Sequence, residues 1–220
     1  LGTDPLGRDY LSRLIYGARI SLVIGLVSAF VSGLIGTTLG VAAGYFGGRV
    51  DAVISFLITA RLSIPIILVA LAVVAIFGSS FLVIITVLGC LLWDRYALVM
   101  RSATQQLVGR DFVMAARIQG ASAWQILSGE IFPNVLPALV VVTTVEIAQA
   151  IMLEAALSFL GLGVPPPLPS WGLMLAEGKG HLLFSPWLIT IPGMALFVLI
   201  LTINAFGDAL QVRGKRRNRA

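Results

Sequence analysis

Long apolar stretches alternate with short polar segments along most of this chain. A helix that crosses the hydrocarbon core of a bilayer needs about 20 mostly apolar residues, and five stretches reach that length. They are Ile20–Tyr45, Val53–Phe77, Phe81–Met100, Val135–Gly161 and Trp187–Phe206. Each run is continuous, whereas barrel strands alternate over about ten residues. The pattern therefore predicts an all-α polytopic transmembrane bundle with five spans.

Small residues and prolines add detail to these spans. Gly36, Gly40 and Gly44 repeat every four residues, a spacing that lets two helix backbones approach closely in a membrane. Pro65 and Pro192 interrupt two other spans. Because proline removes an intrahelical hydrogen bond, each of these spans can kink at that point. The sequence thus indicates a tightly packed bundle.

Composition supports the membrane prediction. Hydrophobic residues make up 58% of the chain and charged residues 11%, whereas a typical soluble domain carries about 25% charged residues. Too few polar side chains are present to cover a water-exposed surface, so we expect lipid to cover part of it. Cys90 lies in an apolar run and is interpreted as a small buried side chain, and the lone histidine, His181, as an exposed loop residue. Neither forms a metal site, and none is expected.

Basic residues indicate the orientation of the spans. Five of them crowd the last eight positions: Arg213, Lys215, Arg216, Arg217 and Arg219. Directly after an apolar span, such a cluster marks the cytoplasmic side, and no aromatic platform accompanies it that would suit nucleic acid. This orientation puts nine basic residues inside and four outside. The expected organisation is an extracytoplasmic segment 1–19, a transmembrane domain 20–208 and a cytoplasmic tail 209–220.

The segment 101–134 holds most polar residues in the middle of the chain, and this topology places it in the cytoplasm. Its spacing predicts a short helix capped by Asp111 and ended by Gly120, since glycine tolerates the left-handed conformation beyond a helix. Ser122 and Gln125 match a capping box for a second helix.

The second short helix is expected over Ala123–Ile131, ending before Pro133. Trp124, Leu127 and Ile131 would share one stripe of it. Such an amphipathic helix can lie among lipid headgroups or in a groove on another protein. The preceding helix with its small-residue face and the tight glycine turn favour a protruding shape, which suits a partner groove better.

Several segments are similar to those of one known family. Asp111-Phe-Val-Met-Ala-Ala-Arg-Ile-Gln-Gly-Ala-Ser122, followed by Ile131-Phe-Pro-Asn-Val-Leu-Pro137, resembles the EAA loop of permeases in binding-protein-dependent ABC importers. The opening Leu1-Gly-Thr-Asp-Pro-Leu-Gly-Arg-Asp9 and the later Ala155-Ala-Leu-Ser-Phe-Leu-Gly-Leu-Gly163 look like the dipeptide, oligopeptide and nickel branch. The resemblance covers essentially the whole chain. One departure is Met114, which stands where the motif has its glutamate.

The resemblance implies a type I ABC importer permease, with six spans expected in a full family chain because one more lies upstream. It implies the cytoplasmic membrane of a bacterium or archaeon, with the C-terminus in the cytoplasm. No Gly-x-x-x-x-Gly-Lys-Ser/Thr sequence occurs, so the chain has no nucleotide cradle of its own. ATP and magnesium are therefore expected on separate ATPase subunits, with no cofactor and no catalytic residue on this chain.

The resemblance also implies partners and contact residues. A homologous second permease subunit, two ATPase subunits and an extracytoplasmic solute-binding protein are expected. The binding protein would approach the outer loop 164–186, where four prolines precede Trp171. Trp171 would anchor that contact, or the loop is instead a plain rigid connector. The residues expected to contact an ATPase are Asp111, Met114, Ala115, Ala116, Arg117, Gly120, Ala121, Ser122, Trp124 and Leu127.

Two acidic residues within the fourth span are functional candidates, because charges inside a membrane are costly. Glu146 and Glu154 lie eight residues apart and hence on roughly the same helix face. They would either line a pathway for peptides with charged ends or pair with Arg61 or Arg95.

The sequence favours an importer permease for di- or oligopeptides, or for nickel complexes. A secondary transporter or channel is the alternative, but it would have no reason for a shaped cytoplasmic helix pair, and we find no inverted repeat. An intramembrane enzyme would need an acid–base or thiolate constellation that a single histidine and an embedded cysteine do not supply.

Overall fold

The computed structural model describes residues 1–217, with side chains through residue 211. Over this range all regular elements are helices. They are α1 (Tyr10–Phe46), α2 (Gly48–Leu62), α3 (Ile66–Phe77), α4 (Phe81–Leu91), α5 (Trp93–Val108), α6 (Asp111–Ile118), α7 (Ala123–Gln125), the π-helix η1 (Ile126–Ile131), α8 (Phe132–Phe159), α9 (Trp171–Gly178), the 3-10 helix η2 (Lys179–His181) and α10 (Trp187–Arg217). The predicted all-α fold is confirmed.

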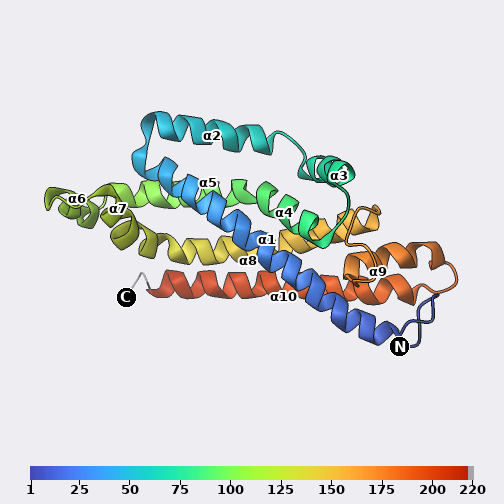
Figure 1. Ribbon diagram of the computed structural model, residues 1–220. Helices are drawn as coiled ribbons and strands as arrows, with labels where there is room; N and C mark the ends of the chain where they lie inside the picture. The colour runs from blue at the N-terminus through green and yellow to red at the C-terminus, as the bar shows by residue number, and fades with distance from the viewer. Residues whose placement is uncertain (218–220) are drawn as a thin grey trace.

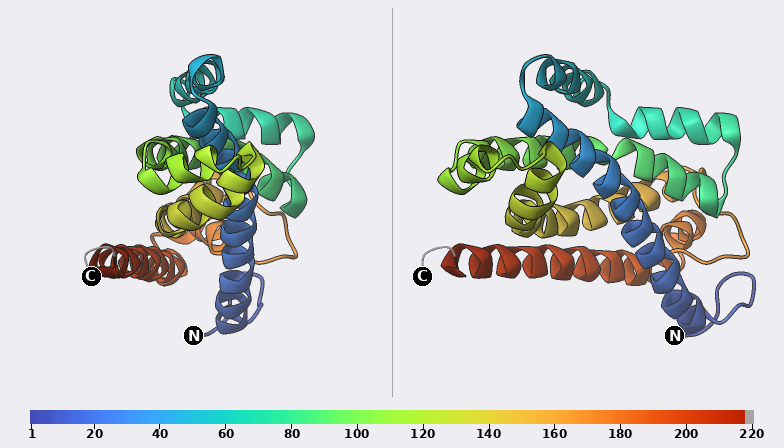
Figure 2. Two further views of the ribbon diagram at one scale, coloured as in Figure 1. Left: turned by 90° about the vertical axis from the view of Figure 1, so that its left-hand side faces the viewer. Right: turned by 60° about the vertical axis from the view of Figure 1, so that its left-hand side comes forward.

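The long helices lie side by side, and the molecule has two distinct ends (Figure 1). One end carries α6, α7 and the last turns of α10, and the other carries the N-terminus and α9. In both turned views α2 and α3 lie on the opposite side of the bundle from α10 (Figure 2). The segment 101–134 and the outer loop 164–186 therefore lie at opposite ends, as the predicted topology requires.

Helix α1 begins ten residues earlier than the predicted span at Ile20. The Asp9 side chain accepts a hydrogen bond from the Ser12 backbone N–H at 2.7 Å, and this cap satisfies an amide that the first turn leaves unpaired. The turns before Ile20 are polar on one side but pack against α9 and α10 on the other. An apolar-length criterion misses such a helical extension.

The predicted close packing of the glycine stripe is confirmed. Helix α1 makes its most extensive contact with α5. A Cβ on Gly36 or Gly40 would collide with the carbonyl oxygen of Trp93 or Ala97, and one on Gly44 would lie 2.6 Å from Cβ of Thr104. The absence of side chains at these positions brings the two backbones together.

The predicted second span is not one helix. It divides at Pro65 into α2 and α3, whose axes differ by 81°. Pro65 is the N-cap of α3 with extended backbone angles, and a proline also disfavours helical geometry in the residue before it. The expected kink at Pro65 is therefore a full break, whereas α10 continues through Pro192.

The other spans follow the prediction with longer bounds. Four helical stretches, one of them formed by α4 and α5 together, are long and apolar enough to cross a membrane, or five spans if the bent α2–α3 pair counts as one. The four are Tyr10–Phe46, Phe81–Val108, Ala123–Phe159 and Trp187–Gln211. Helix α10 also runs into the predicted tail. The five basic side chains of that tail lie outside the described ones: Arg213, Lys215, Arg216, Arg217 and Arg219.

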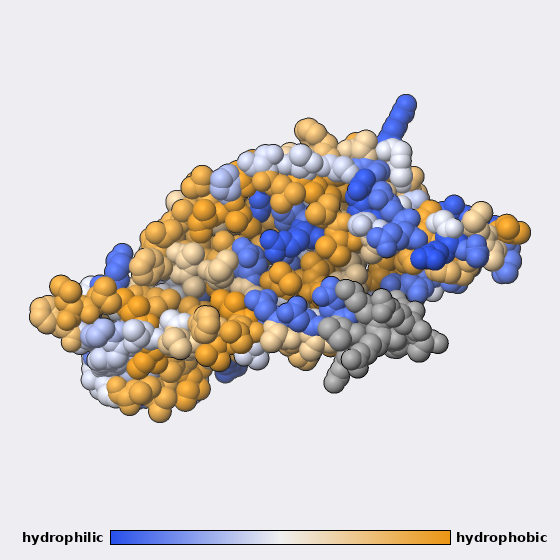
Figure 3. Space-filling view, turned by 180° about the vertical axis from the view of Figure 1, so that it is seen from behind, coloured by the Kyte–Doolittle hydropathy of each residue, from blue (hydrophilic) through white to orange (hydrophobic). Residues whose placement is uncertain are grey.

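Apolar side chains cover much of the outside of the bundle. Phe30, Phe56 and Leu82 are more than 60% exposed, and hydrophobic residues form broad areas of the face in Figure 3. Cys90 is exposed on α4, so the expectation that it is buried is wrong. In a bundle surrounded by lipid, apolar residues need not point inward, and hydropathy alone cannot assign their direction.

Candidate functional site

The predicted ATPase-contacting residues gather at the end of the molecule that carries α6 and α7 (Figure 1). All ten are exposed or half-buried, while Val113 between them is buried and holds α6 to the bundle. The N-cap of α6 is Arg110 rather than Asp111, so that detail of the prediction is wrong. Asp111 is the first helical residue, where its charge still interacts favourably with the helix dipole.

The turn between α6 and α7 has the predicted geometry. Gly120 has a φ of 82°, a left-handed conformation that a β-branched residue adopts only with strain. Ser122 and Gln125 form the predicted capping box: the Ser122 backbone N–H donates to Gln125 Oε1 at 2.8 Å, and the Gln125 backbone N–H donates to Ser122 Oγ at 3.4 Å. The direction in which α7 leaves the turn is thus fixed by local contacts.

The second short helix does not end before Pro133. It continues through η1 into α8, so that Ala123–Phe159 is a single helix. Pro133 therefore lies inside this continuous helix, directly after the π-helical turn η1, where it donates no backbone hydrogen bond. The π-helical turn changes the phase of the helix, so the predicted stripe is also wrong: Ile131 is fully buried while Trp124 is 76% exposed.

Trp124 forms one wall of an apolar groove of about 480 Å³ between α1 and the segment 124–132. Leu127 and Phe132 line the same wall, and Phe46 faces them from the end of α1. Arg117 lies over the ring of Tyr45, 5.3 Å from its centre, which adds a cation–π contact between α6 and α1. Sequence reasoning missed the end of α1 as part of this surface, because no local pattern pairs residues 46 and 124.

A second candidate site lies deeper in the bundle, where the bend between α2 and α3 faces α5 and α8. It is a pocket of about 220 Å³ lined by Arg61, Leu62, Ile64, Pro65, Ile66, Leu92, Asp94, Arg95, Glu146 and Gln149. Arg95 Nη1 lies 3.3 Å from Glu146 Oε1. Glu146 is 1% exposed, whereas the Arg95 side chain is 52% exposed. Of the two predicted pairings, Glu146 with Arg95 is therefore confirmed.

Arg61 interacts with backbone rather than with a glutamate. Its Nη2 donates to the Leu91 carbonyl oxygen at 2.7 Å, and its Nη1 donates to the Ile64 carbonyl oxygen at 3.3 Å. Both carbonyls lie where a helix ends, so the guanidinium satisfies acceptors that have no intrahelical partner. Arg61 thereby ties the α2–α3 break to the end of α4.

Glu154 has a different environment from Glu146, although both are buried. Its Oε1 accepts hydrogen bonds from Ser158 Oγ at 2.7 Å and from Ser170 Oγ at 2.8 Å. Ser170 is the N-cap of α9 and also accepts from the Leu173 N–H at 3.1 Å. These contacts join α8 to the start of α9, which favours an internal packing role for Glu154.

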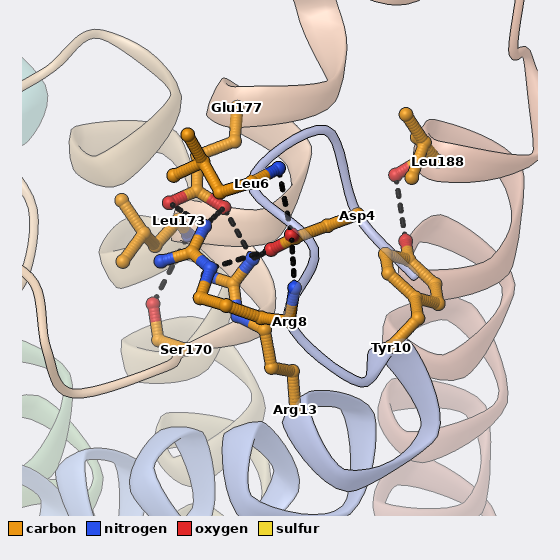
Figure 4. A network of polar contacts seen from close by, with 9 residues as sticks. All are labelled: Asp4, Leu6, Arg8, Tyr10, Arg13, Ser170, Leu173, Glu177 and Leu188. Atoms are coloured by element: carbon orange, nitrogen blue, oxygen red, sulfur yellow. Dashed lines mark hydrogen bonds and ion pairs between the residues drawn. The ribbon is translucent and has the colours of Figure 1, made fainter. Parts of the chain in front are cut away.

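The end of the molecule that carries α9 holds a charged network that motif reading did not assign (Figure 4). Asp4 lies at its centre with its side chain 2% exposed, 2.6 Å from Arg8 Nε and 2.7 Å from Arg13 Nη1. The same two arginines contact Glu177 of α9, at 3.1 Å from Arg8 Nη2 and 2.5 Å from Arg13 Nη1. The network fastens the segment before α1 to α9, 164 or more residues further along the chain.

The outer loop contains a helix, α9, that the prolines before it did not suggest. Trp171 is 8% exposed, and its Nε1–H donates to the Leu14 carbonyl oxygen at 2.8 Å. Gly17 leaves room for the indole ring. Trp171 therefore anchors α9 to α1 and does not provide the external contact expected from the sequence.

Comparison with solved structures defines the class of fold. Over 91% of this chain and 95% of the other, the fold superposes with a TM-score of 0.73 on an inward-facing conformation of the MetNI methionine ABC transporter, at 20% identity. An amino acid ABC transporter gives a TM-score of 0.63 at 18% identity, over 93% and 95% of the two chains. The bundle has the fold of type I ABC importer permeases.

Sequence comparison then defines the family. The family described as "Binding-protein-dependent transport system inner membrane component" matches residues 36–219. The chain is 39% identical to the di/tripeptide transport system permease protein of Pseudomonas aeruginosa and to the glutathione transport system permease protein of Pectobacterium atrosepticum; each match covers 96% of this chain and 70% of the relative. A dipeptide transport system permease protein of Haemophilus influenzae is 39% identical over 96% and 72%. This chain belongs to that family of inner-membrane transport components, and the predicted family is confirmed.

Proposed function

We propose that this chain is the permease subunit through which an ABC importer moves small peptides or related solutes into the cytoplasm. The peptide assignment rests on relatives named for dipeptide, di/tripeptide and glutathione transport. A second permease subunit would complete the pathway, and a solute-binding protein would deliver cargo at the end that carries α9. ATP and magnesium would bind to two separate ATPase subunits.

One observation supports mechanical coupling above all: the helix Ala123–Phe159 is continuous. Trp124, at its exposed end, and Glu146, in the charged pocket, therefore belong to one helix. An ATPase that moves the α6–α7 end would displace the start of this helix. The displacement can reach Glu146 because no non-helical residue separates the two, although the π-helical turn 126–131 and Pro137 interrupt the regular α-helical hydrogen bonds. The coupling residues proposed are Asp111, Met114, Ala115, Ala116, Arg117, Gly120, Ala121, Ser122, Trp124 and Leu127. This is coupling through a two-state element rather than through a single contact.

The same end of the molecule carries the start of α2 and the last turns of α10 (Figure 1). We assign it to the cytoplasm, because the ATPase subunits of an importer work there and because the basic tail favours that side. The N-terminal segment and the outer loop 164–186 then face outward.

Gly120→Val tests the coupling proposal. At a φ of 82° a valine is strained, so the α6–α7 turn must change shape. We expect ATP-driven uptake by the reconstituted importer to fall about tenfold or more while the subunits still copurify, so that ATP hydrolysis no longer drives transport.

Gly109→Val is the matched control. Gly109 has a φ of −91°, and no atom lies within 4 Å of the point that its Cβ would occupy, so the same added side chain fits there without strain. Uptake and ATP hydrolysis should stay at the wild-type ratio. If Gly120→Val transports as much solute per ATP hydrolysed as the wild type does, the coupling role of this turn is refuted.

A further inference from the structure

Four charged side chains share the pocket at the α2–α3 bend: Arg61, Asp94, Arg95 and Glu146. Arg95 lies near the middle of the apolar stretch Phe81–Val108, which α4 and α5 form with a break at Leu92, and Glu146 lies well inside Ala123–Phe159. Both are therefore remote from the helix ends that meet water. Charges at such depth are costly unless they are paired or have a function.

Backbone groups compensate one of these four charges. Arg61 donates to the carbonyl oxygens of Leu91 and Ile64. Asp94 lies in the first turn of α5, directly after the break at Leu92, where the helix dipole favours a negative charge. Arg61 therefore does not depend on the other pocket charges for its compensation.

The charges of Arg95 and Glu146 compensate each other only through a long ion pair. Their atoms are 3.3 Å apart, and Glu146 Oε1 forms no hydrogen bond within the described residues although it is buried. No second acidic partner of Arg95 occurs among those residues, and half of its side chain is exposed. A buried carboxylate without hydrogen bonds is unfavourable, so this pair has more to gain from a new ligand than from its present contact.

We propose that this pocket is a transient binding site for the main chain of a zwitterionic peptide, with Arg95 receiving the carboxylate and Glu146 receiving the ammonium group. The proposal deepens the proposed function and rests on it. The ion pair would open as the peptide replaces each charge with its own complement. A guanidinium can bind a carboxylate through two parallel hydrogen bonds, which the present pair does not form.

The rest of the pocket agrees with a peptide of variable side chains. Leu62, Ile66 and Leu92 are apolar, and Gln149 can donate or accept a hydrogen bond. The two acidic and two basic side chains of the pocket have a formal net charge of zero. A zwitterionic ligand, which also has no net charge, therefore leaves no uncompensated charge when it binds. A volume of about 220 Å³ suits a short peptide segment better than a long chain.

The test uses the complete importer, with its binding protein and ATPase subunits, in proteoliposomes. The probe is alanyl-photoleucine, a dipeptide with free ends and a photoreactive side chain. Irradiation during turnover should attach the probe to pocket residues such as Leu62, Leu92 or Gln149, located by peptide mass spectrometry. Uptake of alanyl-alanine should fall about tenfold in Arg95→Gln and in Glu146→Gln, with labelling reduced in parallel.

Arg101→Gln is the matched control, because Arg101 is also an arginine of α5 and its Nη2 bonds to Asp51 Oδ2 at 2.7 Å outside the pocket. It should leave labelling of the pocket and uptake near wild type. Probe attachment elsewhere with none in the pocket, or uptake in Arg95→Gln and Glu146→Gln equal to that of Arg101→Gln, overturns the site while leaving the permease assignment intact. Absence of ATP-driven uptake by the wild-type importer would instead refute the proposed peptide function, and the site with it.

Discussion

At the scale of single residues, absent side chains matter as much as charged ones. Gly36, Gly40 and Gly44 let α1 lie directly against the backbone of α5. Glycine weakens an isolated helix by about 1 kcal/mol relative to alanine, but here the close approach compensates through extended van der Waals contact. The helix pair thus depends on positions that carry no side chain.

Gly40→Leu should separate α1 from α5. A Cβ at this position would lie 2.9 Å from Cβ of Met100 and collide with the carbonyl oxygen of Ala97, so neither neighbour can yield without a shift of backbone. We expect the free energy of unfolding to fall by about 3 kcal/mol, seen as a lower thermal midpoint in detergent. Thr38→Leu, on the exposed side of the same helix, should have little effect. Equal midpoints for the two variants would contradict the packing argument.

At the scale of elements, the outer end is organised by a short segment that has little regular structure. Residues before α1 reach α9 through Asp4, Arg8, Arg13 and Glu177 (Figure 4). The Tyr10 hydroxyl adds a hydrogen bond to the Leu188 carbonyl oxygen at 2.8 Å, which includes α10. Helix α1 is therefore joined to α9 and α10, which lie far along the chain from it, by side chains from one loop and the first turns of α1.

Asp4→Asn should loosen this outer connection. The buried Asp4 carboxylate compensates the positive charges of Arg8 and Arg13. A neutral amide in its place would leave these two charges without that negative partner. We expect a loss of about 2 kcal/mol, below the value for a fully buried ion pair, because the Arg8 side chain is 35% exposed. Thermal unfolding would measure this loss, with faster amide exchange in α9. Arg19→Gln is the control, since Arg19 is exposed and forms no ion pair among the described residues; an equal effect there would refute the role of the network.

The same variant has an expected pH dependence. Burial alone would raise the pKa of Asp4, but hydrogen bonds from Arg8 and the Leu6 amide outweigh it and lower the pKa below the ordinary value of 3.8. Because the pKa is lower in the folded state, the charged carboxylate stabilises the fold above the ordinary pKa, and this contribution is lost as the pH falls through the folded value. The difference in midpoint between wild type and Asp4→Asn should therefore be full at neutral pH and shrink below about pH 4. A difference that persists unchanged in acid would exclude the carboxylate charge as its cause.

At the scale of the whole molecule, the bundle has two ends with different surfaces. The α6–α7 end presents exposed residues around Trp124, and the α9 end is closed by the charged network. The continuous helix Ala123–Phe159 spans the distance between them. This arrangement allows a movement imposed at one end to reach the interior pocket and the outer surface.

Labelling from each side of the membrane tests the assigned orientation. With Cys90 replaced by alanine, Ser122→Cys should react with a membrane-impermeant maleimide only in inverted vesicles. His181→Cys should react only in right-side-out vesicles, because both side chains are exposed at opposite ends. Mass spectrometry of the labelled chain measures both reactions. The reverse pattern would place the coupling end outside and exclude contact with cytoplasmic ATPases.

The sequence by itself determined the features that depend on neighbours in the chain. Apolar run length predicted five spans, the four-residue repeat predicted glycine packing, and Gly120 with Ser122 and Gln125 predicted the shape of the α6–α7 turn. Each follows from helix periodicity or from local backbone preference. The structure confirms the glycine packing and the turn, and it has four helices of membrane-spanning length, or five spans if the bent α2–α3 pair counts as one.

Only the tertiary structure decided which distant residues meet. It broke the second span at Pro65, fused residues 123–159 into one helix, and exposed Cys90. It also distinguished Glu146, beside Arg95, from Glu154, which bonds to two serines, although both lie on one helix. A membrane bundle is mostly apolar both inside and outside, so hydropathy does not say which way a residue faces. That direction depends on contacts between helices that are far apart in the sequence.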